Sequence, residues 1–430
     1  MISAFLFTIA LVLRLNNLYI DPYGDEAFYF YLARHPQTYF VTPEATSHPP
    51  LLHYLYHPFS QTLANFRLIN ILVGAMVPCL VYLILVKKNV KWPIRVLAPI
   101  IITFHFTFVK FSAIVFLDML GTFFALMALL FYLQGNNWVY CASLFLALMT
   151  KEYFVIFALA QIAAYFLRKH SIHRPTAIAL GLFGVWSFVH YHISGPPLFL
   201  LYVHSYNPLN LASLNRMFIN ILLVPVITLT FQMVNIEFFS ISVVYPLFLY
   251  FWGTCEEWYL ILPIAINSCL IALALNQIPD LKLSRLSPKI RSKLKIILIT
   301  FVMTILIFSF YWETLSTGSF IQTSKNHDLQ EVTDFLKTHF NNQNIAIVDC
   351  FWAYKYYPLG EFMHICYEGW SNQESFESLS WKIGQVGLCI LGKTNTNATI
   401  NLMLQESFKE FIVFHSENKL FIVIHMPTSK

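Results

Sequence analysis

The stretch Trp138–Arg168 reads WVYCASLFLALMTKEYFVIFALAQIAAYFLR. It is apolar on both sides of Thr150-Lys151-Glu152, where two charged residues interrupt the run. The stretch is therefore either one long helix or two spans, 138–150 and 153–168, that meet at the charges. The two alternatives place the rest of the chain on opposite sides of a membrane.

Clusters of Lys and Arg in short loops decide between these alternatives, because such loops stay on the cytoplasmic side of a membrane. The clusters are Lys87, Lys88, Lys91 and Arg95; Arg168, Lys169 and Arg174; and Lys282, Arg285, Lys289, Arg291, Lys293 and Lys295. With a break, four predicted spans separate each cluster from the next, and an even number keeps all three clusters on the same side. Without the break, an odd number of spans would separate the first cluster from the second. We therefore predict a break at Thr150-Lys151-Glu152, on the outer side.

The composition indicates a polytopic α-helical membrane protein. The chain is 57% hydrophobic and 11% charged, whereas about a quarter of the residues of a soluble domain are charged. We predict eleven spans, at about 2–19, 67–86, 94–110, 112–133, 138–150, 153–168, 176–193, 217–234, 238–252, 258–277 and 294–312. Runs of this length and number are typical of a membrane domain rather than a soluble one.

The span count predicts two domains and their orientation. The N-terminus is expected in the cytoplasm, and both the loop 20–66 and everything after residue 312 are expected outside. Residues 1–312 form the predicted transmembrane domain, and residues 313–430 form a small extracytoplasmic α/β domain. In that domain a helix is predicted around Leu329–Phe340 and β-strands at 344–348, 386–391 and 420–424.

Charge and cysteine content argue against several classes of protein. The net charge is +5, yet the basic residues gather in the loops of the membrane part, which is an orientation signal rather than a sign of nucleic-acid binding. The seven cysteines show no CxxC spacing, so neither a zinc ribbon nor a dense disulfide framework is predicted.

Two adjacent acids, Asp25 and Glu26, follow the first predicted span. A carboxylate partly desolvated by neighbouring aromatic residues can act as a general base for a hydroxyl nucleophile. The alternative is that both acids complement the N-terminal dipole of a helix beginning at Ala27.

A second motif, His48-Pro49-Pro50-Leu51, holds a histidine in a fixed direction ahead of a helix. The order Arg14-Leu15, Asp25-Glu26-Ala27-Phe28-Tyr29, His48-Pro49-Pro50-Leu51, Arg67-Leu68 resembles the protein O-mannosyltransferase and lipid A aminoarabinose transferase group of GT-C glycosyltransferases. Asp118 and the segment Leu148–Glu152 extend the resemblance more loosely, to about residue 170.

The resemblance implies an inverting transferase, with a sugar carried on polyprenyl or dolichyl phosphate and an acceptor hydroxyl approaching from outside. It implies that Asp25 is the base, that Glu26 orients or binds the acceptor, and that Asp118 is a second acid. The acceptor class (protein, glycan or lipid), the sugar (mannosyl, other hexosyl or pentosyl) and the membrane (plasma membrane or endoplasmic reticulum) stay open.

Cations near the outer ends of the predicted spans suit a lipid phosphate. We assign Arg67, Lys151, Arg216 and His48 to binding of the donor phosphate or substrate. The alternatives are that Arg67 and Arg216 only extend to the membrane interface, and that Lys151 pairs with Glu152. For Asp118 the alternative is a buried pair with Lys110 or Arg14.

No cofactor or metal site is predicted. His53 and His57 have the spacing of one helix face but lack a third ligand, although some relatives in the resembled group bind a divalent ion. Glu256-Glu257-Trp258-Tyr259 is interpreted as an interfacial aromatic belt rather than a sugar contact. The alternative functions are a polytopic transporter or a ligand-sensing membrane protein, but the chain shows no half-length repeat with paired broken helices, which many transporters have.

Overall fold

The structure is a computed structural model. It describes residues 2–15, 18, 26–40, 48–194, 236–251, 257–277, 328–340, 345–348, 364–367, 388–392, 406, 409–415 and 421–425. Two compact units make up the chain. The helical unit contains Met1–Leu18 and His35–Gly318, and the second unit contains Tyr19–Arg34 and Ser319–Lys430.

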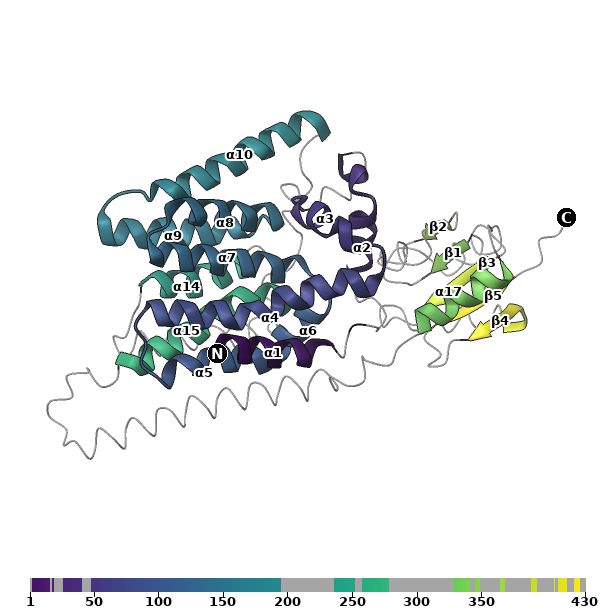
Figure 1. Ribbon diagram of the computed structural model, residues 1–430. Coiled ribbons are helices and arrows are strands. Elements are labelled where there is room, and N and C mark those ends of the chain that lie inside the picture. The colour runs from purple at the N-terminus through teal and green to yellow at the C-terminus, as the bar shows by residue number, and fades with distance from the viewer. Residues whose placement is uncertain are drawn as a thin grey trace. The chain divides into compact units, whose positions relative to one another are not determined.

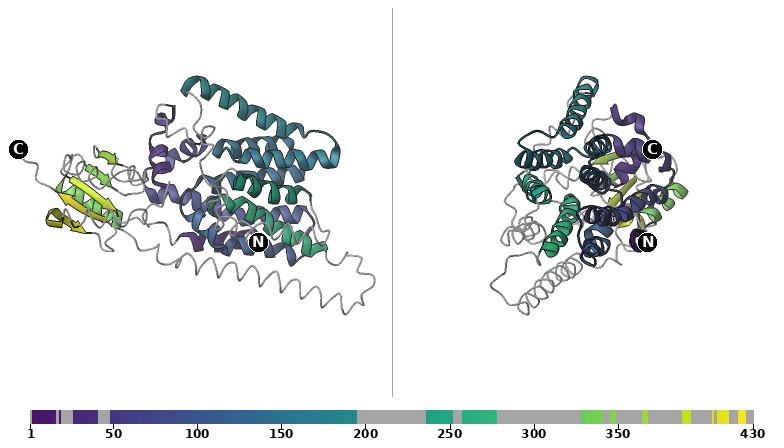
Figure 2. Two further views of the ribbon diagram at one scale, coloured as in Figure 1. Left: turned by 180° about the vertical axis from the view of Figure 1, so that it is seen from behind. Right: turned by 60° about the vertical axis from the view of Figure 1, so that its left-hand side comes forward.

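The helical unit is a bundle of apolar helices that lie side by side (Figures 1 and 2). The long elements are α1 (Ile2–Leu15), α4 (Leu63–Lys87), α5 (Ile94–Phe104), α6 (Phe106–Ala113), α7 (Leu117–Gln134), α8 (Asn137–Thr150), α9 (Phe154–Lys169), α10 (Arg174–Ser194), α14 (Ile236–Phe251) and α15 (Ile261–Gln277). The short elements are η1 (Pro36–Phe40), α3 (Leu51–Tyr56), η3 (His57–Phe59) and η5 (Glu257–Leu260).

Among the described residues, three helices are long and apolar enough to cross a membrane: α4, α7 and most of α10. Helices α5 and α6 meet the same test only as a pair, which is bent by 57° at the break between them. The shorter helices α1, α8 and α15 are also apolar. The predicted spans 217–234 and 294–312 lie outside the described residues, so the count of eleven stays a prediction.

The predicted break at Thr150-Lys151-Glu152 is confirmed. Helix α8 ends at Thr150, Lys151 has an extended backbone (φ −155°, ψ 133°), and α9 begins at Phe154. At the other end of α8 the chain reverses through Gly135, whose φ of 75° ends α7, and Asn136, whose side chain accepts the backbone N–H of Val139 at 3.3 Å. This tight reversal brings the start of α7 and the end of α8 to the same end of the bundle.

A buried asparagine on α4 fixes the start of α7. The amide nitrogen of Asn70 donates to the carbonyl oxygens of Phe111 (3.2 Å), Ser112 (3.2 Å) and Ile114 (2.7 Å). These carbonyls belong to the end of α6, where the helix leaves its acceptors without intrahelical partners. The hydroxyl of Tyr56 donates to the other end of the same amide at 3.2 Å. Asn70 thereby connects the outer loop, α4 and the turn that leads into α7.

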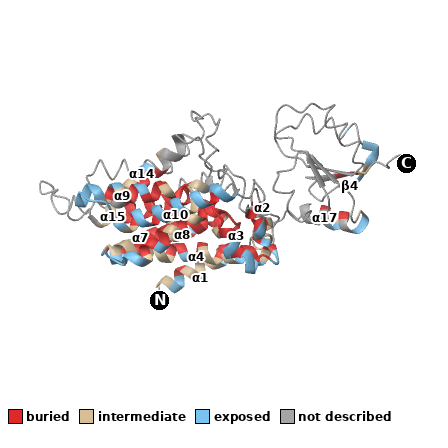
Figure 3. Ribbon diagram, turned by 90° about the horizontal axis from the view of Figure 1, so that it is seen from above, coloured by how far each residue is buried: buried red, intermediate tan, exposed pale blue. Residues whose placement is uncertain are grey.

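The core of the bundle lies around α7 and α8, where buried residues dominate, whereas α10 exposes most of its apolar face (Figure 3). Two glycines allow close helix packing in this core. A Cβ atom on Gly121 of α7 would lie 2.1 Å from the ring of Phe154 of α9, and one on Gly74 of α4 would lie 2.1 Å from Cβ of Ser112. The exposed apolar face of α10 is suited to lipid.

The second unit contains a five-stranded sheet. Its strands are β1 (Ile345–Val348), β2 (His364–Tyr367), β3 (Leu388–Gly392), β4 (Ile412–His415) and β5 (Phe421–His425), in the order β2-β1-β3-β5-β4. Strands β1, β2 and β3 are parallel, whereas β5 runs antiparallel to both β3 and β4. The unit also holds α2 (Glu26–Arg34), α17 (Asp328–His339) and η10 (Lys409–Phe411).

Helix α17 and strands β1, β3 and β5 fall on the stretches predicted from the sequence. Helix α17 packs on β4 and β5, where the ring of Phe335 stacks on that of Phe414 at 4.5 Å. The predicted boundary between residues 312 and 313 lies outside the described residues, and the extracytoplasmic location of the tail stays a prediction.

Candidate active site

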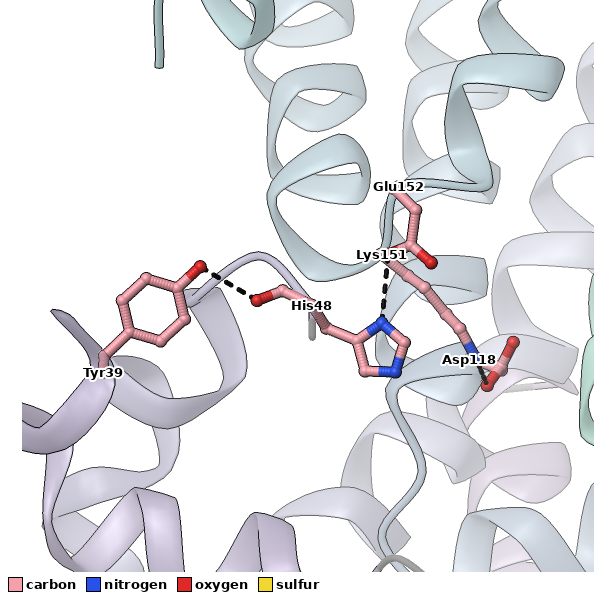
Figure 4. A network of polar contacts seen from close by, with 5 residues as sticks. All are labelled: Tyr39, His48, Asp118, Lys151 and Glu152. Atoms are coloured by element: carbon pink, nitrogen blue, oxygen red, sulfur yellow. Dashed lines mark hydrogen bonds and ion pairs between the residues drawn. The ribbon is translucent and has the colours of Figure 1, made fainter. Parts of the chain in front are cut away.

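A buried ion pair lies where α7 begins and α8 ends. Nζ of Lys151 donates to Oδ2 of Asp118 at 2.8 Å, and the two side chains are only 2% and 3% exposed (Figure 4). Asp118 is the second residue of α7, and Lys151 directly follows α8. Taking two charges out of water is costly, and a buried pair offsets that cost only with good geometry. Such a pair in an apolar chain is a functional hypothesis by default.

The pairing corrects two alternatives from the sequence. Asp118 does not pair with Lys110 or Arg14: the Arg14 guanidinium donates to the Ser112 hydroxyl and, at 2.7 Å, to the Ala10 carbonyl oxygen. Lys151 does not pair with Glu152 either. Both alternatives assumed that residues close in sequence, or on the same side of the membrane, would pair. The α7–α8 reversal instead brings together residues 33 positions apart.

Two tyrosines surround the Lys151 ammonium. Nζ lies 4.1 Å from the ring centroid of Tyr259 and 5.5 Å from that of Tyr153, and the two rings meet edge to face at 5.1 Å. An ammonium over an aromatic face is attracted by the ring quadrupole, more strongly when water is excluded. The interpretation of Tyr259 as a member of an interfacial belt is therefore incomplete, because this residue also covers a buried cation.

One oxygen of Asp118 stays available. Among the described residues, Oδ1 of Asp118 has no hydrogen-bond partner, although it is buried. An unpaired buried acceptor costs about 1–3 kcal/mol. Native proteins seldom accept this cost without a reason, and a bound group that donates a hydrogen bond would remove it.

A second polar contact connects the outer loop to the end of α8. Nδ1 of His48 lies 3.1 Å from Oε2 of Glu152, and the hydroxyl of Tyr39 donates to the His48 carbonyl oxygen at 2.9 Å (Figure 4). Pro49 and Pro50 follow, and α3 begins at Leu51. The motif therefore places His48 beside the Lys151–Asp118 pair. Sequence reasoning missed Glu152 in this role, because it considered that acid only as a possible partner of Lys151.

Aromatic and histidine rings of the outer loop and of α10 form a small buried cluster. Tyr39 lies 5.6 Å from His53 and 5.7 Å from His190, between ring centroids. Burial lowers the pKa of His53 to about 3, and the neighbouring His48 adds to this effect. Burial, then the charge of Glu152 and the neighbouring Tyr54, raise the pKa of Tyr39 above its usual value. Both rings are therefore neutral at physiological pH.

Of the other predicted site residues, the structure describes Arg67 and Glu26. Arg67 on α4 is fully buried, and its Nη1 donates to the Leu18 carbonyl oxygen at 3.4 Å. Glu26 is buried at the start of α2, in the second unit. Asp25 and Arg216 lie outside the described residues, so their assignments stay predictions.

Within the described part of the chain, no group of three or more His, Cys, Asp or Glu side chains could hold a metal ion. His53 and His57 fall on consecutive elements, α3 and η3, rather than on one continuous helix. Of the two, His53 is buried against Tyr39, whereas His57 is exposed.

The bundle resembles solved membrane proteins. ArnT from Cupriavidus metallidurans in the apo state superposes with a TM-score of 0.55 at 13% sequence identity, over 98% of this chain and 97% of that chain. The chain has the fold of ArnT. ArnT from the same organism bound to undecaprenyl phosphate gives a TM-score of 0.58 at 12% identity, over 99% and 98% of the two chains. The chain's sequence matches no family model and no curated protein.

This fold, together with the apolar helices, makes the chain a polytopic helical membrane protein. The likeness to ArnT concerns the fold alone. The GT-C group, and the choice between a mannosyltransferase and an aminoarabinose transferase, rest on the sequence resemblance.

Proposed function

We propose that this protein transfers a sugar from a polyprenyl- or dolichyl-phosphate donor to an acceptor hydroxyl, with inversion at the anomeric carbon. The observation that carries the proposal is the buried Lys151–Asp118 pair at the end of an apolar bundle. The full-length likeness to ArnT, which has been solved with undecaprenyl phosphate bound, supports a lipid-phosphate partner.

The chemistry needs one base and several cations. The acceptor oxygen forms a bond to the anomeric carbon while the bond from that carbon to the phosphate oxygen breaks. The acceptor proton passes to a carboxylate, for which we propose Asp25 with Glu26 beside it. The leaving polyprenyl phosphate takes the electron pair as an anion, so no acid is needed to protonate it.

The cations would stabilise the phosphate as charge develops on it. Lys151 uses one of its three donors on Asp118, and we propose that another meets the incoming phosphate. We propose that Asp118 holds this ammonium in place and that Arg67, His48 and Arg216 complete the phosphate site. An Arg guanidinium offers two parallel donors to a phosphate, which a lysine does not.

The finer features of the proposal come from the sequence. We propose that transfer occurs on the outer or lumenal face of a plasma membrane or endoplasmic reticulum, next to the loop 20–66. A mannosyl donor with protein acceptors and an aminoarabinosyl donor with a lipid acceptor are both compatible with the resembled group.

The test is release of polyprenyl phosphate from a panel of radiolabelled polyprenyl-phosphate sugars by purified protein, with crude membrane extract as acceptor. Wild type is expected to turn over at least one donor. Asp25→Asn is expected to abolish release while its thermal unfolding midpoint stays unchanged. A fully active Asp25→Asn variant would remove the base assignment, and no turnover of any donor by folded protein would favour a transporter or a ligand sensor.

A further inference from the structure

Glu152 lies beside Lys151 in the chain but does not join its ion pair. Glu152 is the middle residue of the break between α8 and α9, and its Oε2 lies 3.1 Å from Nδ1 of His48. Its side chain is 11% exposed and that of His48 is 19% exposed. The contact joins residues 104 positions apart.

We propose that Glu152 is a positioning residue that accepts the Nδ1–H of His48 and directs the Nε2 edge of the imidazole toward the Asp118–Lys151 pair. The inference rests on the proposed function, because it gives His48 a donor phosphate to contact. Glu152 itself touches no substrate in this arrangement.

The backbone explains why neighbouring side chains serve two different partners. Lys151 is extended, and successive side chains of an extended segment point to opposite sides. Lys151 therefore faces Asp118 while Glu152 faces the outer loop. If α8 continued through these residues, the two side chains would lie only about 100° apart around the helix.

The imidazole of His48 is held at both ends. Its backbone is fixed by the Tyr39 hydroxyl at 2.9 Å and by the two prolines that follow. Its ring is fixed by Glu152, and in Figure 4 it lies below Glu152 and to the left of the Asp118–Lys151 pair, with Nε2 on the side of that pair. A hydrogen bond to one ring nitrogen determines the proton state and direction of the other.

The groups around the ring determine what it can bind. They are the carboxylates of Glu152 and Asp118, the ammonium of Lys151, the neutral ring of His53 and the phenol of Tyr39. With Glu152 accepting the Nδ1–H, Nε2 is the ring nitrogen on the side of the Asp118–Lys151 pair. A phosphate held by the Lys151 ammonium would therefore lie next to Nε2, and no proton transfer is required of His48.

The alternative is that the pair only fastens the outer loop to the bundle. If the contact only fastens the loop, Glu152 variants are expected to lose stability whether or not residue 48 is a histidine. A positioning role predicts a loss of turnover that depends on His48, and a double-mutant cycle separates these outcomes.

The experiment measures kcat and KM for donor and acceptor in wild type, Glu152→Ala, His48→Gln and the double variant, by release of polyprenyl phosphate. Glu152→Ala is expected to lower kcat/KM for the donor about tenfold or more when His48 is present, and less than about twofold in the His48→Gln background. The acceptor KM is expected to stay unchanged. Glu152→Gln, which keeps an acceptor oxygen for Nδ1–H, is expected to retain more activity than Glu152→Ala.

Two controls accompany the cycle. His57→Gln changes an exposed histidine of the same loop, and Glu410→Gln changes an exposed glutamate of the second unit; both are expected to be as active as wild type. If Glu152→Ala fails to fold, the cycle is repeated with Glu152→Gln. Additive losses, or a shift in acceptor KM alone, would overturn the positioning role in an active enzyme. An inactive wild type would overturn the proposed function and the inference together.

Discussion

Burying a lysine and an aspartate costs desolvation free energy, so a buried pair is weak evidence for stability and indicates a functional role. Replacing a buried ion pair by apolar residues of similar volume is often neutral or stabilising, whereas removing one partner is strongly destabilising. The Lys151–Asp118 pair, with exposures of 2% and 3%, therefore allows stability and activity to be separated by mutation.

We predict that Asp118→Leu alone lowers the free energy of unfolding by about 3–5 kcal/mol, because Lys151 is left as an unpaired buried charge. The double variant Asp118→Leu/Lys151→Met is expected to recover most of that stability and to show no transferase activity. Thermal unfolding in detergent and the release assay measure the two quantities on the same samples. An active double variant would exclude both residues from the phosphate site.

His53 gives a prediction for pH. Its pKa is lowered to about 3 in the fold, so between pH 6.5 and 3 the unfolded chain binds a proton that the folded protein does not. The folded protein therefore loses stability as the pH falls through this range, and His53→Leu, which has no imidazole, does not. We expect the stability of wild type relative to His53→Leu to fall by about 2 kcal/mol between pH 7 and pH 5. Unfolding at both pH values measures it, with the exposed His57→Leu as matched reference, and a difference independent of pH would contradict the burial of His53.

Some of the site residues could be predicted from the sequence and others could not. The break at Thr150-Lys151-Glu152 was predictable, because charges in an apolar run and the parity of basic loops both required it. The partners were not predictable, because they depend on which way side chains point after an extended residue. Tyr259 gave no signal beyond its place in an aromatic turn, yet it lies 4.1 Å from the Lys151 ammonium.

At the scale of elements, the site depends on how closely α7, α8 and α9 approach. Gly121 lies one helical turn from Asp118, and its missing side chain makes room for Phe154 at the start of α9. At the opposite ends of these helices His173, which precedes α10, lies among Tyr132, Tyr140 and Tyr165 at 4.7–5.2 Å between ring centroids. Helices α7, α8 and α9 are therefore connected at both ends, and the site end is the one that depends on a glycine.

We predict that Gly121→Ala lowers the free energy of unfolding by about 1–3 kcal/mol, because its Cβ would overlap the Phe154 ring. The loss is expected to be partly recovered in Gly121→Ala/Phe154→Leu. Gly181→Ala on α10 is the matched control, since a Cβ there meets nothing within 4 Å. Equal stability of the Gly121 and Gly181 variants would contradict the close packing of α7 and α9.

For the molecule as a whole, hydropathy predicted a polytopic helical membrane protein. The spacing of apolar residues predicted the positions of most described helices and strands. Helix α17 was predicted from its helical periodicity, and strands β1, β3 and β5 from their short β-type apolar runs. Strands β2 (His364–Tyr367) and β4 (Ile412–His415) were not predicted, because each has only four residues and one end of each is a histidine. The resemblance in the first 170 residues, rather than composition, pointed to the ArnT fold.

The orientation of the chain is a whole-molecule prediction. Eleven spans and a cytoplasmic N-terminus place Lys430 outside, so a reporter that is active only outside the cytoplasm is expected to be active after Lys430 and inactive in the loop around Lys88. Fusions at these two positions measure it directly. A cytoplasmic reporter after Lys430 would make the number of spans even.

The reversal at Gly135 and Asn136 has a consequence for biogenesis. Asp118 and Lys151 belong to one helical hairpin, so the translocon receives both charges within a single pair of consecutive helices. Each charge alone opposes partitioning into lipid. As a hairpin the two charges can neutralise one another before α9 and the later helices arrive, so the membrane can accept this part of the site without waiting for the C-terminal half of the bundle.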